Sequence, residues 1–133
     1  MRRNSEKGAA AVEFALVLPL LVMLLVGMLE FGLVLWRQEM MTNATREAAR
    51  AGIVAGTPRL TQAEIQAILE ANLNLAGIDP ATTTITITGV GGASGDPLTV
   101  SVVYPYQFMV INQFATSLGA NIDLTAQTVM FLE

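Results

Sequence analysis

A long run of uncharged residues near the start of the chain limits its possible folds more than any other feature. Residues 14–29, between Glu13 and Glu30, include 16 positions without a charge. At about 1.5 Å per residue this run covers about 24 Å, which is short of the roughly 30 Å hydrocarbon core of a bilayer. Continued through Glu30 to Trp36 it counts 23 residues and reaches about 34 Å, enough for a tilted span. We therefore predict a transmembrane helix over residues 9–36, with Glu30 inside it or near its far face.

The charges on either side of this helix predict its orientation. Residues 1–8 are short and basic, with Arg2, Arg3 and Lys7 opposed only by Glu6. Positively charged flanks stay on the cytoplasmic side of a membrane, so the N-terminus is predicted in the cytoplasm and the rest of the chain outside it. At the other end, Trp36 followed by Arg37 is typical of an anchor at the membrane interface.

A cleaved secretory signal is the alternative interpretation of this region. Such a signal has an apolar run of about 7–15 residues and an exit of the type small-x-small. The run here is longer, and the residues from Glu30 to Trp36 contain no Ala-x-Ala sequence. The pattern therefore favours a helix that stays in the membrane over conventional signal cleavage.

The composition disfavours an enzyme and a nucleic-acid-binding protein. Hydrophobic residues make up 53% of the chain and charged residues only 14%, against about 25% charged in an average soluble domain. The chain has no Cys and no His, which excludes a thiolate nucleophile and removes the commonest general base and the commonest metal ligand. Its net charge is −4, which gives no overall attraction to nucleic acid. We expect no cofactor, no metal and no small-molecule substrate.

The helical pattern continues beyond the predicted span, over residues 37–56. Small residues recur at spacings of three and four, so they form one stripe along the helix. Such a stripe lets another backbone approach closely, and the partner is either the chain's own domain or a neighbouring subunit. Gly56, Thr57 and Pro58 predict the end of the helix, with Gly56 as a left-handed cap. The stripe consists of Met41, Ala44, Ala48, Ala51, Gly52 and Ala55.

The last part of the chain, residues 59–133, predicts a small α+β unit. Thr61 and Glu64 form a capping-box pattern that starts a helix over 61–76. Alternating or β-branched segments predict strands at 82–88, at 98–104 with an end at Pro105, and at 122–132. The glycine-rich segment 89–97 suits a hairpin, and 108–118 suits a short helix or a loop. We expect the helix to cover one face of an antiparallel three-stranded sheet, giving an α+β fold class.

The residues around the start of the apolar helix resemble a known processing site. The sequence Lys7-Gly8-Ala9-Ala10-Ala11-Val12-Glu13-Phe14 is similar to the site in type IV prepilins, where a basic leader ends in Gly and the fifth mature residue is Glu. Cleavage after Gly8 would make Ala9 the first residue and Glu13 the fifth. Together with the segments at 30–32 and 45–52, this sequence resembles the TadE-like family of the tight-adherence (Tad) pilus system. Glu13-Phe14 and the long distal region favour its minor pilins or pseudopilins.

This resemblance implies a structural role and no reaction of the protein's own. It implies a subunit of a Tad pilus, anchored in the bacterial inner membrane and processed after Gly8 by a prepilin peptidase. Its partners would be other pilin or pseudopilin subunits, the pilus assembly platform and the lipid bilayer. Glu13 would pair with the α-amine of an adjacent subunit and so set the register of stacked helices. For Glu30, solvation at the interface and pairing with a partner stay equally open.

The alternative function is an accessory protein that is never cleaved and never enters the fibre. Such a protein would remain a single-pass membrane anchor for components of the pilus or of a secretion machinery. Only the spacing from Gly8 to Glu13 separates the two hypotheses in the sequence. The predicted organisation is a leader at 1–8, a transmembrane helix at 9–36, its continuation at 37–56 and the α+β unit at 59–133.

Overall fold

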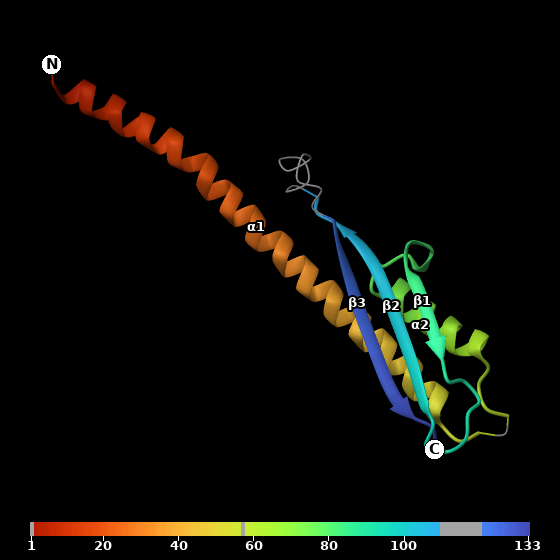
Figure 1. Cartoon of the computed structure of the whole chain (residues 1–133). Helices are drawn as coiled ribbons and strands as arrows, with labels where there is room; N and C mark the ends of the chain where they lie inside the picture. Colours follow the sequence, from red (N-terminus) through yellow and green to blue (C-terminus); the bar gives the residue numbers. More distant parts are fainter. Residues whose placement is uncertain (1, 57, 110–120) are drawn as a thin grey trace.

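A single long helix runs through the protein from its N-terminus into its core. The computed structural model describes residues 2–56, 58–109 and 121–133. Helix α1 spans Arg2–Ile53 and continues through Pro19 without a break. Its N-terminal half projects away from the other elements, which gather around its C-terminal half (Figure 1). The uninterrupted helix follows from a sequence without glycine pairs or further prolines in this range.

The second helix begins as the sequence predicts. Helix α2 spans Gln62–Leu75, and the Thr61 side chain accepts a hydrogen bond from the Glu64 N–H. In return, Glu64 Oε2 accepts from the Thr61 N–H at 2.7 Å. This reciprocal pair satisfies N–H groups that have no partner inside the helix. After α2, Asp79 caps a 3₁₀ turn at Pro80–Thr82, and this turn is why the first strand begins at Thr84 rather than at residue 82.

The three strands form the predicted antiparallel sheet. They are β1 at Thr84–Thr88, β2 at Pro97–Gln107 and β3 at Asn121–Phe131, in the spatial order β1-β2-β3. The register places Val100 between Ile87 and Thr128. Gly89 starts the hairpin between β1 and β2 with a φ of 86°. A Cβ there would lie 2.0 Å from the Pro97 carbonyl oxygen, so only glycine fits this turn.

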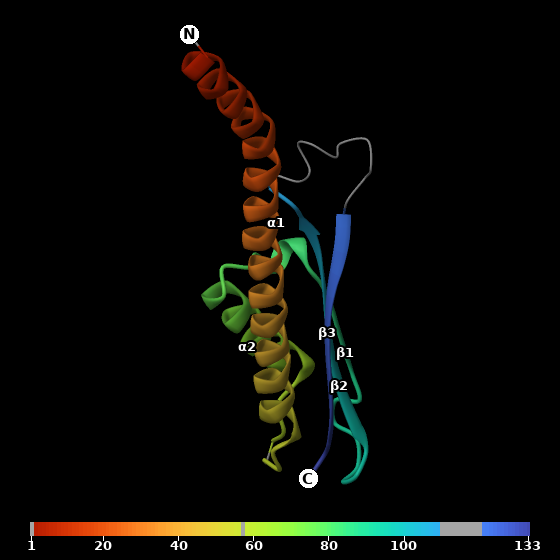
Figure 2. The same ribbon diagram turned by 90° about the vertical axis from the view of Figure 1, so that its left-hand side faces the viewer.

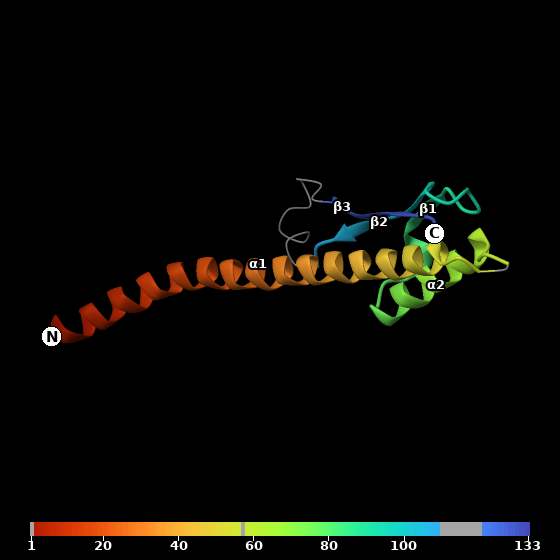
Figure 3. The ribbon, with the colours of Figure 1, turned by 90° about the horizontal axis from the view of Figure 1, so that it is seen from below.

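Both helices lie on one face of the sheet, which makes a two-layer structure (Figure 2). Seen from below, α1 runs beneath β2 and β3, and α2 lies beside it (Figure 3). We predicted that the helix at 61–76 covers one face of the sheet. Instead, α1 packs on β2 and β3, while α2 packs mainly on α1 and contacts the sheet at β1. The inner face of the sheet supplies Ile87, Leu98, Val100, Val102, Leu124 and Ala126 to the core.

A glycine allows the three elements to meet in this core. A Cβ on Gly52 of α1 would lie 2.6 Å from Leu98 Cδ2 of β2 and 2.8 Å from Ile65 Cδ1 of α2. Atoms never approach so closely without displacement, so the absence of a side chain at Gly52 lets α1, α2 and β2 pack together. The α+β fold class predicted from the sequence is confirmed.

Two predicted boundaries and one predicted helix cap are wrong. Strand β2 does not end at Pro105 but continues to Gln107. Strand β1 ends opposite Val103, so Pro105 has a neighbouring strand on one side only, which is where sheets tolerate proline. Helix α1 ends at Ile53, so Ala55 lies beyond it, and the backbone of Gly56 is not left-handed. Most of the segment 108–118 lies outside the described residues.

The capping box predicts how acid affects α2. Hydrogen bonds from the backbone N–H and the hydroxyl of Thr61 hold the pKa of Glu64 below its usual value of 4.5. A lowered pKa in the folded state means that this stabilisation is complete above pH 4.5 and is lost as the pH falls through the folded-state pKa. Glu64→Gln should therefore destabilise the full chain at pH 7, and the difference from the parent should shrink below pH 4.5. Urea unfolding in detergent micelles at several pH values measures this.

The exposed Glu47 on α1 provides a matched control for that experiment. Glu47→Gln removes the same charge from an exposed helix position. The difference in unfolding free energy between Glu47→Gln and the parent should not shrink in the same way as the pH falls. A difference between Glu64→Gln and the parent that is equal at pH 7 and pH 3 would contradict the assignment.

Candidate functional site

The N-terminal half of α1 is apolar and uncovered. Nearly all side chains from Gly8 to Leu29 are exposed; only Val26 and Gly27 are half-buried. In the part of the chain that the structure describes, α1 contains the one helix that is long and apolar enough to cross a membrane. Its most apolar window is not buried at all by the rest of the chain. Exposed aliphatic side chains on this scale are costly in water, so this surface requires lipid or another protein.

The predicted processing residues lie together at the free end of this helix. Gly8, Ala9, Glu13 and Phe14 are all helical and exposed. A Cβ on Gly8 would have no neighbour within 4 Å. The end of α1 is therefore open to an external partner, and the fold itself places no constraint on Gly8.

The two acidic residues predicted in or near the span lie in different surroundings. Glu13 is exposed, whereas Glu30 is only 4% exposed and Val34, one turn further, only 7%. The side chains directly before and after Glu30, Leu29 and Phe31, are exposed. One face of α1 thus enters the folded part of the molecule at Glu30, while the opposite face stays open.

Arg37 holds the helix to the sheet by contacts that the sequence did not predict. Its Nη1 donates a hydrogen bond of 2.6 Å to the Tyr104 hydroxyl. Its guanidinium carbon also lies 5.6 Å from the centroid of the Tyr104 ring and 5.3 Å from that of Tyr106. A cation over aromatic faces is attracted by their quadrupoles. We interpreted Arg37 as part of an interfacial anchor with Trp36; in the structure it faces β2.

Two further polar contacts join α1 to β3. Gln38 Nε2 donates to the Thr125 carbonyl oxygen at 2.7 Å. The hydroxyls of Thr45 and Thr128 lie 2.9 Å apart in a hydrogen bond, and Thr45 is fully buried. Because α1 contributes one partner to each bond, the helix and the sheet share a fixed register. One sequence signal could have predicted this contact, namely the polar Thr45 among the small residues of the buried stripe. An analysis of hydropathy alone does not detect it.

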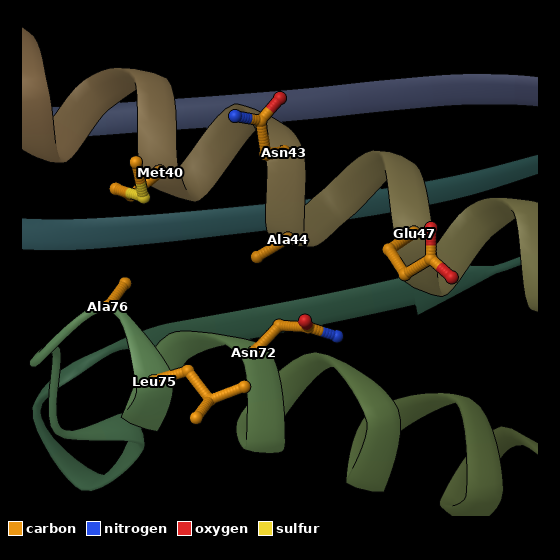
Figure 4. A pocket seen from close by; sticks show the side chains of 7 residues that line it. All are labelled: Met40, Asn43, Ala44, Glu47, Asn72, Leu75 and Ala76. Carbon is orange, nitrogen blue, oxygen red and sulfur yellow. The ribbon is translucent and has the colours of Figure 1, made fainter.

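The stripe of small residues packs on the chain's own domain. Met41, Ala44, Ala48 and Gly52 are buried, Ala51 is half-buried, and Ala55 is exposed. Ala44 faces α2 across a shallow groove of about 360 Å³, which Figure 4 shows from close by. The sequence left two partners open, the chain's own domain and a neighbouring subunit. In the structure, the four buried positions pack against α2 and the sheet of the same chain. The groove is lined by Met40, Asn43, Ala44, Glu47, Asn72, Leu75 and Ala76.

The comparison with protein families gives a match over the same helix. Residues 8–50 match the family model described as TadE-like protein. Over these residues the chain is similar to the TadE-like family. The match begins at the predicted processing site and ends near the end of α1, before α2 and the sheet. Searches of curated proteins and of solved structures gave no match.

The TadE-like family comprises pilin-like proteins associated with Tad pili, so the match over residues 8–50 indicates a pilin-like N-terminal helix. Together with the apolar helix it indicates association with a membrane. The family is structural rather than enzymatic. Among the described residues, no group of three or more acidic, His or Cys side chains could hold a metal ion.

The buried stripe predicts a stability effect that tests whether it packs within the chain. Ala48 is fully buried between α1 and its neighbours, so Ala48→Leu should overpack the core and cost about 1–3 kcal/mol of unfolding free energy. Ala63→Leu adds the same side chain at an exposed position of α2 and should change stability by less than about 0.5 kcal/mol. Urea unfolding of both variants in micelles compares them. Equal stability of the two would show that Ala48 does not pack within the chain.

Proposed function

We propose that the protein is a minor pilin or pseudopilin of a Tad pilus, processed by a prepilin peptidase after Gly8. The observation that carries this proposal is the position of Gly8 and Glu13. They keep the spacing of the type IV site, and they lie within the matched segment at the exposed end of α1. That helix then runs without a break into a small sheet domain, so one rigid element connects the processed end to the distal surface.

The exposed half of α1 has two successive environments in this proposal. Before assembly it spans the inner membrane, with the N-terminus in the cytoplasm and the sheet outside. In a fibre, the helices of other pilin or pseudopilin subunits cover the same apolar surface in place of lipid. Both environments satisfy the aliphatic side chains of residues 9–29, which the chain itself leaves uncovered.

Glu13 supplies the register between subunits. A carboxylate in hydrocarbon is costly and persists where a partner compensates it. Cleavage after Gly8 produces an α-amine at Ala9, and the amine of an adjacent subunit can pair with the Glu13 carboxylate. The exposure of Glu13 on α1 leaves it available for such an intermolecular pair. The pair would neutralise two charges at one axial position, and so disfavour other staggers.

The folded part at residues 30–133 would act as the adaptor. It has no reaction of its own and would contact other subunits or the assembly platform. Three exposed Thr side chains of β1, at positions 84, 86 and 88, lie on its outer face. This polar face stays available when α1 is covered, because the helices lie on the other side of the sheet.

Processing gives the first test of this function. Replacing Gly8 by Leu should block cleavage, because a peptidase must approach the backbone closely at that residue. Gly32→Leu is a matched control, since a Cβ at either glycine has no neighbour within 4 Å. Intact mass and N-terminal sequencing should find the parent and Gly32→Leu chains starting at Ala9, and Gly8→Leu starting at Met1. A parent chain that starts at Met1 in its own cells would instead support the uncleaved accessory protein.

The carboxylate gives the second test. Glu13→Ala should insert into membranes as well as the parent, because a charge is removed from the apolar segment. It should nevertheless reduce processing or incorporation into pili, because the partner amine loses its counter-ion. Glu39→Ala, on an exposed part of α1 outside the uncovered half, is the control and should leave both unchanged. Immunoblotting of sheared pili measures incorporation, and normal piliation with Glu13→Ala would refute the registry role.

A further inference from the structure

The alignment of β2 with α1 gives the height of the sheet along the helix. Leu98 of β2 lies against Gly52, and Tyr104 accepts a hydrogen bond from Arg37. Tyr104 lies six residues after Leu98, which is about 20 Å along the strand. Arg37 lies fifteen residues before Gly52, which is about 22 Å along the helix. The two lengths agree, so β2 runs alongside α1 in the opposite direction, toward the N-terminal half (Figure 1).

The end of β2 therefore lies at the level of Glu30. The three residues from Tyr104 to Gln107 add about 10 Å of strand, which corresponds to about seven residues of helix before Arg37. The burial of Glu30 at 4% and Val34 at 7% exposure supports this placement, because one face of α1 is covered from that height onward. Sequence alone assigned residues 30–36 to the membrane, but the sheet stands beside them.

The end of β2 beyond Val103 cannot lie in the hydrocarbon core of a bilayer. Beyond Val103, strand β2 is paired with β3 only, and backbone groups on an open strand edge have no partner in lipid. The bilayer core must therefore end at or before Glu30. Residues 9–29 count 21 positions and cover about 32 Å, which is enough to span the core without the remaining seven.

The side chains at this end of the sheet suit a lipid headgroup layer. Met109 is 73% exposed, and Ile122, which pairs with Tyr106, is 37% exposed. The rings of Tyr106 and Phe108 contact each other at 5.3 Å, with Arg37 over the tyrosine. Aromatic and cationic side chains beside exposed apolar ones are characteristic of the membrane interface. Tyr106 itself is buried at 3% exposure and supports the group from the core. We call the half-buried and exposed side chains of this group, Tyr104, Phe108, Met109 and Ile122, the sheet tip.

We propose that the sheet tip rests on the headgroup layer of the bilayer that α1 leaves at Glu30. This proposal rests on the single-pass anchoring in the proposed function. It adds a second membrane contact, continuous with the uncovered surface of α1, that fixes how the domain stands on the membrane. A subunit leaving the membrane for a fibre would have to release both the helix and the tip.

Spin labels on single cysteines test this contact in the full chain. The protein has no cysteine, so each substitution creates a unique attachment site. Met109→Cys reports the residues just beyond the end of β2, and Ile122→Cys reports the neighbouring strand at the level of Tyr106. Phe131→Cys, 66% exposed at the opposite end of β3, is the matched control, and Leu20→Cys reports the middle of the span. In vesicles of phosphatidylethanolamine and phosphatidylglycerol, collisions with oxygen and with a water-soluble nickel chelate give the depth of each label.

The expected result is a graded series of depths. The Leu20 label should collide with oxygen and not with nickel, the Met109 and Ile122 labels should show headgroup depth, and the Phe131 label should be fully accessible to nickel. The tip contact would be overturned if both tip labels were as accessible to nickel as the Phe131 label. If the Leu20 label were still deep in that case, the anchor would remain intact. A nickel-accessible Leu20 label would overturn the anchor itself, and the tip proposal with it.

Discussion

The double use of α1 is the constraint on which the rest of the structure depends. One face of the helix from Glu30 to Ile53 is core, whereas the same helix from Gly8 to Leu29 is uncovered. The inner face of a three-stranded sheet needs a covering layer, and α2 with 14 residues is too short to cover all of it. Helix α1 supplies that layer, so its uncovered apolar half and the domain are joined by one continuous helix.

The chemistry at the contact explains why the helix changes composition along its length. In the uncovered half, bulky aliphatic residues suit lipid or neighbouring helices. In the covered half, Ala44, Ala48 and Gly52 allow close approach of α2 and β2. Polar side chains on the same half, Arg37, Gln38 and Thr45, bond to the sheet. The small residues set the distance between the layers, and the polar bonds set their register.

The sequence predicted the elements of this fold better than their packing. The capping box at Thr61, the glycine hairpin and the three strands were visible because each depends on a few neighbouring residues. The covering of the sheet by α1 was left open, because a stripe of small residues can pack equally well on the chain's own domain or on a neighbouring subunit. The end of β2 at Pro105 was wrong, since proline breaks a strand only where both edges are paired, and pairing is a property of the whole sheet.

The same reason limits the prediction of the candidate site. Gly8 and Glu13 are recognised from their spacing alone, and their exposure in the structure agrees with recognition from outside. Glu30 could not be placed from the sequence, because its burial at 4% exposure arises from the folded chain and not from its sequence neighbours, Leu29 and Phe31, which are exposed. Arg37 illustrates the opposite case, in which an apparent interfacial anchor bonds to a tyrosine 67 residues later.

The claim that α1 is part of the domain core has a direct test in two fragments. Residues 30–133 contain the covered half of the helix, whereas residues 59–133 contain α2 and the sheet without it. If α1 provides the covering layer, ¹H–¹⁵N spectra should be dispersed for fragment 30–133 and collapsed for fragment 59–133. A dispersed, folded spectrum of fragment 59–133 alone would contradict the account, because the sheet would then have a core without α1.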